Sequence, residues 1–467
     1  MSNKEKRRCI LYVFDSLRYR MPSGNSVEDV APNICELSKD SIQFSNAYSQ
    51  GIWTYPSAAT IFTGTYPQVH NSHQHDIPLD SKLPHITDGT SDITTACFST
   101  TLGVSPERNF EQNFDEFYHI AKNGEPLQPN IMGILNDNLL DWIEKNKDEE
   151  FLLVVWAMGT HHPYKTPSEF DNPSRQLNNT DEGSAAWMMD QPISNSSKIK
   201  DLYLNTVQHT DDKFGEMIHK LKNIGIYDET NIIATSDHGE IFDEHARMEH
   251  ASKFIKGAIP KLIGEKRCQR NLLFEPTSFL GHQAVYPYKE LTHVPLFYKI
   301  SSNNTSPVDK YDGIVELVDI VETIRSIFGI DGMNTQGNNL LSYIRTESTK
   351  ELSYSSSQFF NGNLVFQSVH DGEYQYMTRD LVTEKVRDRK KAVQSLLSYI
   401  FGDNKTIVEF DSGKRVNNNE MTKIMSIDLT NKIDECKVYK RELGVNNSDG
   451  ISVSQETADH LEDLGYK

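Results

Sequence analysis

The 467-residue sequence has no long apolar stretch, few cysteines and no excess of basic residues. Its first apolar run, residues 9–14, is short and ends at a charged residue, so it is neither the core of a signal peptide nor a membrane span. No other run reaches spanning length. The five cysteines are widely scattered and form no CxxC pair. They look like reduced cysteines, and the sequence therefore predicts a cytoplasmic protein.

The charge balance excludes some classes of partner. Lys and Arg number 47 against 66 Asp and Glu, which gives a formal net charge of -19. Such a chain is a poor candidate for sequence-independent binding to nucleic acid or for docking on anionic lipid, because both need a basic surface. A site for an anionic substrate would need local positive charge, which a metal ion could supply. Nothing in the sequence fixes the oligomeric state.

Short apolar runs alternate with helical patterns along most of the chain, which is typical of an α/β protein with a mainly parallel sheet. Hydrophobic residues make up 37% of the chain, enough for one large domain and a smaller one. Strands are expected at residues 9–14, 92–98, 151–157, 230–235 and 294–299. Helices are expected at residues 29–40, 130–146, 199–224 and 313–328.

The pattern changes after about residue 345. Residues 351–377 alternate in the manner of β-strands, an Asn-rich patch at 417–419 is expected to be a loop, and a terminal helix is expected near 454–465. We therefore expect a larger domain over residues 8–345 and a smaller α+β subdomain over residues 346–467. The stretch 246–280 looks like an insertion into the larger domain, and it carries no chemistry that we can assign.

Three residues that can bind a metal follow predicted strands. Asp15 comes directly after the first strand, and Asp237 and His238 follow the strand that ends near residue 235. Functional residues of parallel α/β sheets collect at the carboxyl ends of the strands. Two carboxylates and an imidazole there make a plausible site for a divalent metal. A lone Asp after a strand is more commonly a turn or cap residue, and residue types alone leave the two interpretations about even.

Residues 49–64 (SQGIWTYPSAATIFTG) resemble the nucleophile turn of the sulfatase family, in which the nucleophile, any residue, Pro and Ser open a helix. Aligned on Pro56 and Ser57, the nucleophile position falls on Thr54. A hydroxyl at a helix N-terminus beside a divalent cation has a lowered pKa, and the alkoxide can attack an anionic ester. Taken alone, the segment would favour a simpler role for Thr54 as the cap of the helix.

Further segments resemble the same family, in the same order, along nearly the whole chain. Phe14-Asp15-Ser16-Leu17-Arg18 looks like its opening metal motif, His161-His162-Pro163-Tyr164 like its HxPY motif, and Ser236-Asp237-His238-Gly239-Glu240 like its second metal motif. Gly281-His282 is similar to the segment that carries a substrate-side His or Lys. The resemblance implies the fold of the alkaline phosphatase superfamily: a three-layer αβα sandwich with a smaller C-terminal α+β subdomain.

The resemblance also implies roles for individual residues. The implied ligands of one divalent metal ion are Asp15, Thr54, Asp237 and His238. Thr54 would attack in line to give a covalent phospho-threonine, while His161 and His282 would neutralise non-bridging oxygens or protonate the leaving group. The two histidines could instead belong to a second metal site, but too few matching carboxylates support that alternative.

Departures from the family pattern bear on substrate and metal. Sulfatases carry a Cys or Ser that is oxidised to formylglycine, and Thr54 cannot be converted to that aldehyde. Ala58 replaces an Arg of the same motif. Family members with a Thr nucleophile act on phosphoryl groups, so a phosphoric ester is favoured over a sulfuric ester. Ser16 and His238 replace an Asp and an Asn of the metal motifs, which favours zinc or manganese, with calcium or magnesium possible.

The sequence therefore predicts a metal-dependent hydrolase of phosphate mono- or diesters that acts on an anionic ester through phospho-Thr54. Three alternatives stay open. A transferase of a phospho-group to a glycan or lipid acceptor would share every catalytic residue, although such family members usually carry membrane anchors. The other two are a sulfuric ester hydrolase and an inactive binding protein that kept the fold.

Overall fold

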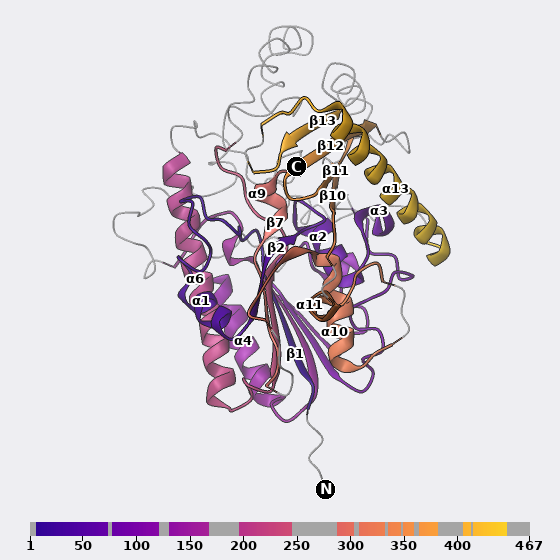
Figure 1. Cartoon of the computed structure of the whole chain (residues 1–467). Coiled ribbons are helices and arrows are strands. Elements are labelled where there is room, and N and C mark those ends of the chain that lie inside the picture. The colour runs from indigo at the N-terminus through magenta and orange to yellow at the C-terminus, as the bar shows by residue number, and fades with distance from the viewer. Residues whose placement is uncertain are drawn as a thin grey trace, which may run out of the picture.

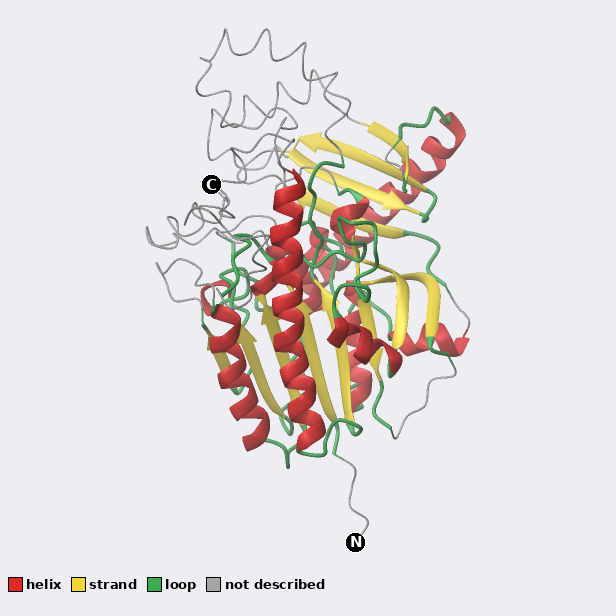
Figure 2. Ribbon diagram, turned by 90° about the vertical axis from the view of Figure 1, so that its left-hand side faces the viewer, coloured by secondary structure: helices red, strands yellow, loops and turns green. Residues whose placement is uncertain are grey.

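Figure 1 shows the computed structural model of the protein. It describes residues 6–72, 77–120, 130–167, 196–244, 287–302, 308–331, 335–346, 349–358, 364–381, 405–411 and 414–445. Two β-sheets organise these residues: a nine-stranded, mostly parallel sheet and a four-stranded antiparallel sheet. Helices cover both faces of the larger sheet, which confirms the predicted αβα sandwich (Figure 1, Figure 2). Within the described ranges, the helices are too short or too polar to cross a membrane.

The larger sheet has β1 near its centre. In order across the sheet, the strands are β4 (Glu116–His119), β3 (Thr94–Ser99), β5 (Phe151–Ala157), β1 (Arg8–Phe14), β6 (Thr230–Ser236), β8 (Leu296–Lys299), β2 (Ile42–Tyr48) and β7 (His293–Val294), while β9 (Lys310–Glu316) pairs with β2. β1 runs parallel to both neighbours, and Phe14 lies opposite Ala157 and Ser236. The three central strands therefore end at the same level, and the residues that follow them meet at one edge.

Two groups of helices bury the two faces of this sheet. One face carries α1 (Pro32–Lys39), α4 (Ile131–Lys145) and α6 (Ser196–Asn223), and the other carries α2 (Thr54–Thr63), α10 (Ile320–Phe328) and α11 (Leu340–Thr346). Two short helices are α3 (Pro67–His70) and α9 (Lys289–Thr292). Every residue of β1 is buried; Leu11 and Val13 pack toward α2 and α10, and Tyr12 packs toward α6. A strand buried on both faces needs such a continuous apolar run.

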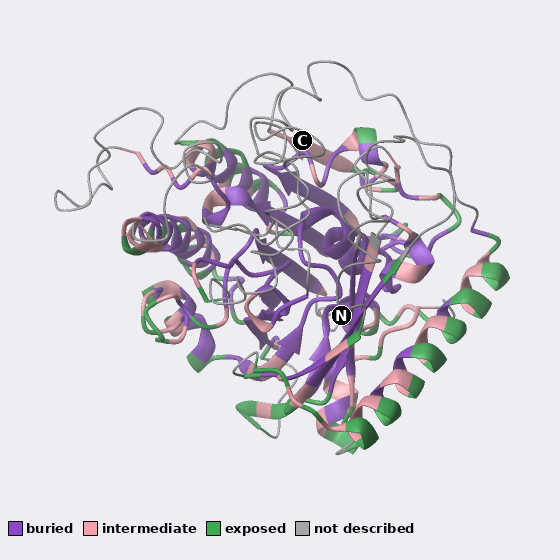
Figure 3. Cartoon of the chain, turned by 90° about the horizontal axis from the view of Figure 1, so that it is seen from above, coloured by how far each residue is buried: buried purple, intermediate pink, exposed green. Residues whose placement is uncertain are grey.

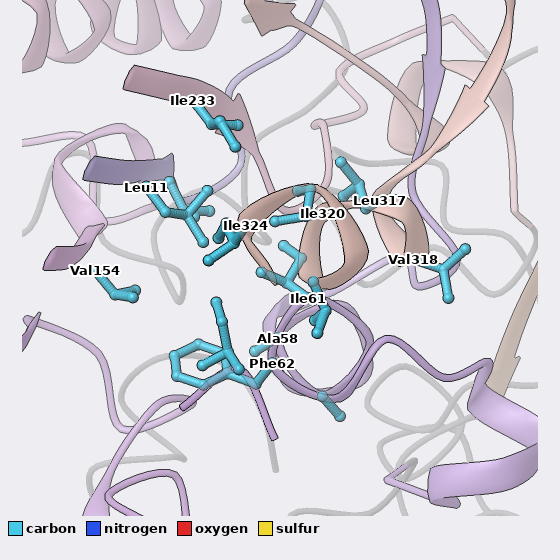
Figure 4. Close-up of a cluster of buried hydrophobic side chains, with 14 of the residues drawn as sticks. Leu11, Ala58, Ile61, Phe62, Val154, Ile233, Leu317, Val318, Ile320 and Ile324 are labelled. Carbon is cyan, nitrogen blue, oxygen red and sulfur yellow. The ribbon is translucent and has the colours of Figure 1, made fainter. Parts of the chain in front are cut away.

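Helix α2 lies deep in its group. All ten of its residues are buried, and Ile61 lies close to Ile320 and Ile324 of α10 (Figure 4). The helix ends at Gly64, whose φ of +62° is in the left-handed region that favours glycine. Because interiors are close-packed, the helix has little room to move against the sheet. The position of its first residue, Thr54, is fixed by this packing.

The smaller sheet is antiparallel throughout. Its strands are, in order, β10 (Ser353–Gln358), β11 (Leu364–His370), β12 (Tyr374–Leu381) and β13 (Lys405–Glu409). Helix α13 (Asn419–Leu443) packs on it through Met425 and Leu429, which share a small core with Val369, Tyr376 and Ile407. Many residues on the outer faces of the helices are exposed, whereas the strands of the larger sheet are largely buried (Figure 3). The β pattern predicted for residues 351–377 is thus confirmed.

A partly buried lysine joins the two sheets. Lys350 Nζ lies 2.8 Å from Glu316 Oε2 and 2.9 Å from Asp319 Oδ1, and both carboxylates are almost fully buried. Glu316 Oε1 also accepts hydrogen bonds from the Tyr354 backbone N–H (2.9 Å) and from Gln50 Nε2 (3.2 Å). Gln50 belongs to the loop between β2 and α2, so the network connects the smaller sheet to the loop that leads to Thr54.

The prediction of one helix over residues 313–328 is wrong at its start. Residues 310–316 form β9, and α10 begins only at Ile320. Ile314 and Val315 lie opposite Asn46 and Ala47 of β2. Both are β-branched, which favours an extended strand packed against neighbours. The helical spacing of apolar residues across this boundary is produced by two elements.

Helix α13 was missed in the sequence. The Asn-rich patch expected as a loop begins it, because the Asn418 side chain caps the helix by accepting a hydrogen bond from the Met421 N–H. The terminal helix predicted near 454–465 and the insertion predicted at 246–280 lie outside the described residues. The division of the chain after residue 345 stays a prediction.

Candidate active site

The predicted metal ligands lie together at the carboxyl edge of the larger sheet. Asp15 follows β1 and its N–H donates to the Ala157 carbonyl of β5 (2.9 Å), while the Asp237 N–H donates to the Phe14 carbonyl (3.3 Å). Asp15, Asp237 and His238 can each bring one ligand atom within 4.8 Å of the others. All three residues are completely buried. The level ends of β1 and β6 are what bring these residues together.

The hydrogen bonds of His238 orient it for ligation. Its Nδ1 lies 2.7 Å from the Gly239 carbonyl oxygen, so Nδ1 carries the proton and Nε2 presents its lone pair. Nε2 lies 3.7 Å from Asp15 Oδ1 and 3.5 Å from Asp237 Oδ2. The three side chains thus surround one point with an imidazole nitrogen and carboxylate oxygens.

Asp237 has one oxygen engaged and one available. Its Oδ1 accepts hydrogen bonds from the Ser16 N–H (2.9 Å) and the His238 N–H (2.8 Å). Its Oδ2 is buried and has no hydrogen-bond partner within the part of the chain that the structure describes. Buried carboxylate oxygens are rarely left without a partner. This available oxygen, with the donor set around it, fits a divalent cation.

The pKa shifts of these three residues also favour a bound cation. Burial, and then the charge of Asp237, raises the pKa of Asp15 well above its ordinary value. Burial raises the pKa of Asp237 to about 8 and lowers the pKa of His238. Two carboxylates and a neutral imidazole in a dry site are costly by themselves, and a cation among them reverses this cost. Strongly shifted pKa values of this kind are typical of functional sites.

Thr54 adjoins this cluster. It is the first residue of α2, and its Oγ1 lies 3.3 Å from both Asp15 Oδ1 and Asp15 Oδ2. The residue in the N-cap position is Trp53, so the simpler interpretation of Thr54 as the helix cap does not hold. The side chain is 3% exposed. A hydroxyl at the positive end of a helix, beside the carboxylates of the candidate metal site, is well placed to act as a nucleophile.

Two residues that the sequence did not single out complete the surroundings of Thr54. Trp156 Nε1 donates to Asp15 Oδ2 at 3.3 Å and so helps to orient this carboxylate. Gly103 lies against Thr54 so closely that an added Cβ would stand 2.6 Å from Thr54 Cγ2. Trp156 belongs to an apolar strand whose sequence indicates only a core position, and the loop that contains Gly103 carries no recognisable motif. Only the tertiary fold shows their place.

Of the two predicted substrate-side histidines, the structure describes His161. His161 is buried in the turn after β5, and its Nδ1 is hydrogen-bonded to the His162 carbonyl. Thr160 Oγ1 ties this turn to the metal cluster by donating to the Asp15 carbonyl at 2.5 Å. Tyr164 donates to Glu240 Oε2 at 2.6 Å, which joins the His161–Tyr164 motif to the segment after Asp237. His282 lies outside the described residues.

Comparison with known proteins decides the family. The family model described as Sulfatase matches residues 9–330, which is more than half of the chain. The chain belongs to the sulfatase family. Members of this family are metal-dependent enzymes that act on anionic ester bonds, and Asp15, Asp237 and His238 form the candidate metal site of this sulfatase-family enzyme. The identity of the ester and of the metal is a separate question.

Individual relatives are distant. The chain is 24% identical over 198 residues to the low-salt glycan biosynthesis sulfotransferase Agl7 of Haloferax volcanii, a match that covers 42% of this chain and 40% of that protein. It is 22% identical over 418 residues to arylsulfatase K of Xenopus laevis, covering 76% and 69%. The solved phosphonate monoester hydrolase of Silicibacter pomeroyi superposes with a TM-score of 0.65 at 15% identity, covering 94% and 96%. At this identity the structural likeness shows the fold alone.

Proposed function

We propose that this sulfatase-family protein is a metal-dependent hydrolase of phosphate mono- or diesters with Thr54 as its nucleophile. The observation that carries the proposal is the 3.3 Å approach of Thr54 Oγ1 to both oxygens of Asp15, inside the buried cluster with Asp237 and His238. Threonine cannot become the formylglycine that sulfate hydrolysis uses in this family. It can form a phosphoester, which supports a phosphoric ester as the substrate.

The proposed metal ligands are Asp15, Thr54, Asp237 and His238. The imidazole nitrogen among them favours zinc or manganese over calcium. When bound, a divalent cation supplies positive charge that polarises a phosphoryl oxygen and lowers the pKa of a neighbouring hydroxyl. The chain as a whole carries a formal net charge of -19, so an anionic substrate needs such local positive charge to bind.

The chain's own residues then account for the two halves of the reaction. Asp15 is the acceptor within reach of the Thr54 hydroxyl proton. Thr54 Oγ1 attacks phosphorus in line, the bond to the leaving oxygen breaks, and phospho-threonine forms. His161, whose Nδ1 is held by the His162 carbonyl, acts as an imidazolium and donates its Nε2 proton to the leaving oxygen. In the second half, water attacks phosphorus and gives a proton to Nε2 of the now neutral His161. The bond from phosphorus to Thr54 Oγ1 breaks, Asp15 returns its proton to Oγ1, and the phosphate product leaves.

Transfer to an acceptor is the second candidate. The likeness to a sulfotransferase supports it, because the same constellation serves when an acceptor hydroxyl replaces water in the second step. A sulfuric ester hydrolase is the third, in keeping with the arylsulfatase relative. In both alternatives the residues around Thr54 keep their positions, so only rates and products distinguish them.

The test is a set of rate measurements in Mn²⁺ or Zn²⁺ with nitrophenyl phosphate, bis-nitrophenyl phosphate and nitrophenyl sulfate. Thr54→Ala is expected to lower phosphate-ester turnover at least about a thousandfold. Thr63→Ala is the matched control, because Thr63 is a buried threonine of the same helix whose hydroxyl donates to Ala59 instead. Mass spectrometry of quenched wild type should find one phosphoryl group on the peptide that contains Thr54.

Three results would contradict the proposal in different ways. Full activity of Thr54→Ala would remove the nucleophile assignment. Preference for nitrophenyl sulfate would favour the sulfuric ester hydrolase. Phospho-Thr54 that accumulates without release of phosphate would favour the transferase, since an acceptor would then be missing.

A further inference from the structure

A pocket of about 310 Å³ opens where the turn after β1, helix α9 and the end of the smaller sheet meet. Its lining contains three cations, Arg18, Arg20 and Lys289, and two carboxylates, Glu290 of α9 and Asp411 of the turn after β13. Figure 1 shows α9 between the larger sheet and the strands of the smaller sheet. None of these residues has a role in the proposed reaction, and the pocket is distinct from the buried cluster around Asp237.

Both metal-binding turns continue into the wall of this pocket. Arg18 stands three positions after Asp15. On the other side, the Gly239 N–H donates to the Leu291 carbonyl at 2.8 Å, and the Glu290 carbonyl oxygen packs so closely that a Cβ on Gly239 would stand 2.0 Å from it. The residue after the ligand His238 therefore touches the residue that lines the pocket. The candidate metal cluster and the pocket are therefore neighbours in the fold.

The three cations differ in how firmly they are engaged. Arg18 is buried and held, because its Nη1 lies 2.5 Å from Glu244 Oε1 and its Nε donates to the Arg20 carbonyl at 2.8 Å. Lys289 forms an ion pair with Asp411, but the Asp411 side chain is 81% exposed, and such pairs contribute little. Arg20 is exposed and forms no ion pair with any residue that the structure describes. Arg20 and Lys289 can therefore turn to a ligand at small cost.

An aromatic wall faces these cations. The rings of Tyr19 and His293 stack with centroids 4.1 Å apart, and Tyr48 lies behind His293 at 5.0 Å. His293 Nε2 is 2.8 Å from the Ser45 carbonyl oxygen, which holds the ring in place. Burial lowers the pKa of His293 to about 3, so this ring adds a flat apolar surface and no charge at neutral pH. A ligand with a flat ring next to its charged group could stack this ring on the aromatic side chains.

We propose that this pocket binds a second anionic group of the substrate, a carboxylate, phosphate or sulfate joined to a flat ring, through Arg20 and Lys289. The proposal rests on the proposed function, since it assumes that an anionic ester binds at the neighbouring cluster. It narrows the substrate class to esters with at least two anionic groups. In a protein with a formal net charge of -19, a lining with three cations against two carboxylates is a local excess of positive charge that an anionic group can use.

The test uses ligands that the enzyme cannot hydrolyse as esters, so that it does not depend on turnover. Calorimetric titration in Mn²⁺ compares phenylphosphonate with 3- and 4-phosphonobenzoate, which differ from it only by one carboxylate. At least one phosphonobenzoate is expected to bind wild type about tenfold more tightly, the worth of one charge-assisted contact. Arg20→Gln and Lys289→Gln should each remove most of this preference and leave phenylphosphonate affinity within about twofold. Lys39→Gln is the control, since Lys39 is an exposed lysine of α1 outside the pocket.

The outcomes separate this proposal from the proposed function. Equal affinities for the three ligands would contradict the proposed role of the pocket in binding an anionic group, and so would a preference that survives both substitutions. Neither result would bear on phosphate-ester turnover. A preference that depends on Arg20 and Lys289 would support the binding role of the pocket. If the same protein hydrolysed no phosphate ester, the proposed hydrolase activity would be wrong. Failure of all three phosphonates to bind would overturn both. Thermal unfolding of each variant shows that the substitutions leave the fold intact.

Discussion

Replacing Gly103 by Ala would push directly on the proposed nucleophile. The added Cβ would stand 2.6 Å from Thr54 Cγ2 and 3.2 Å from Thr54 Cβ, whereas ordinary contact begins at 3.4 Å. Either the loop or Thr54 must therefore yield by about 0.8 Å. Gly103 is absent from the glycines with positive φ, so alanine is compatible with its backbone and the collision is the main effect.

The size of the effect follows from this distance. Overpacking of this kind costs about 1–3 kcal/mol of stability. A misplacement of a catalytic group by about 1 Å can cost about a hundredfold in rate. We therefore expect kcat/KM for a phosphate ester to fall by about two orders of magnitude in Gly103→Ala, with only a modest loss in Tm. The helix that carries Thr54 is buried throughout and cannot move away to relieve the contact.

A second substitution tests whether contact with Thr54 Cγ2 causes the loss in rate. Thr54→Ser removes Cγ2, the atom that the new methyl group would strike, and keeps the hydroxyl. In the double variant Thr54→Ser/Gly103→Ala, the second change should therefore cost much less than it costs in wild type. The assay is kcat/KM and Tm for the four proteins of this cycle. A Gly103→Ala protein with wild-type activity, or strictly additive losses, would show that Gly103 does not set the position of Thr54.

Three further predictions concern stability. Lys350→Met should lower the free energy of unfolding in urea by about 3–5 kcal/mol, because it leaves Glu316 and Asp319 buried without their cation; a loss below about 1 kcal/mol would contradict this. Burial lowers the pKa of His370 to about 3, and both ring nitrogens lack a hydrogen-bond partner among the residues described. The neutral histidine therefore contributes to stability above pH 6.5, and this contribution is lost as pH falls. Between pH 6.5 and 5 the free energy of unfolding of wild type should fall by about 2 kcal/mol more than that of His370→Leu. Equal losses in the two proteins would refute the assignment. Chelation with EDTA should lower Tm and Mn²⁺ should restore it, whereas the Tm of Asp237→Asn should respond to neither; a variant that responds like wild type would remove Asp237 from the metal site.

Sequence reasoning predicted the central strands well, for a physical reason. β5 has the predicted bounds, 151–157, and β6 extends the predicted 230–235 by one residue. Strands buried on both faces are continuous apolar runs, which are visible without any tertiary information. The same reasoning placed Asp15 and Asp237 at neighbouring strand ends, and the structure brings them together.

The failures have physical reasons too. Ile314 and Val315 belong to a strand whose apolar residues continue, at helical spacing, into the helix behind it, so periodicity alone merged the two. Gly103 and Trp156 approach Thr54 and Asp15 from distant parts of the chain, and no local pattern announces such contacts. The positions of Thr54 and His238 came from motifs, and their roles stay proposals until the rates are measured.

The ion-pair network around Lys350 couples the stability of the larger sheet to the segment that leads into the smaller sheet. The family match ends at residue 330, yet the cation that neutralises Glu316 and Asp319 comes from beyond it. A chain cut at that point would keep two buried carboxylates and lose their cation, which would lower the stability of the larger sheet. The protein should therefore unfold in one cooperative transition, with both sheets losing structure together. Removal of the chain after residue 330 should therefore lower Tm, even though the deleted part lies far from Thr54 in the sequence.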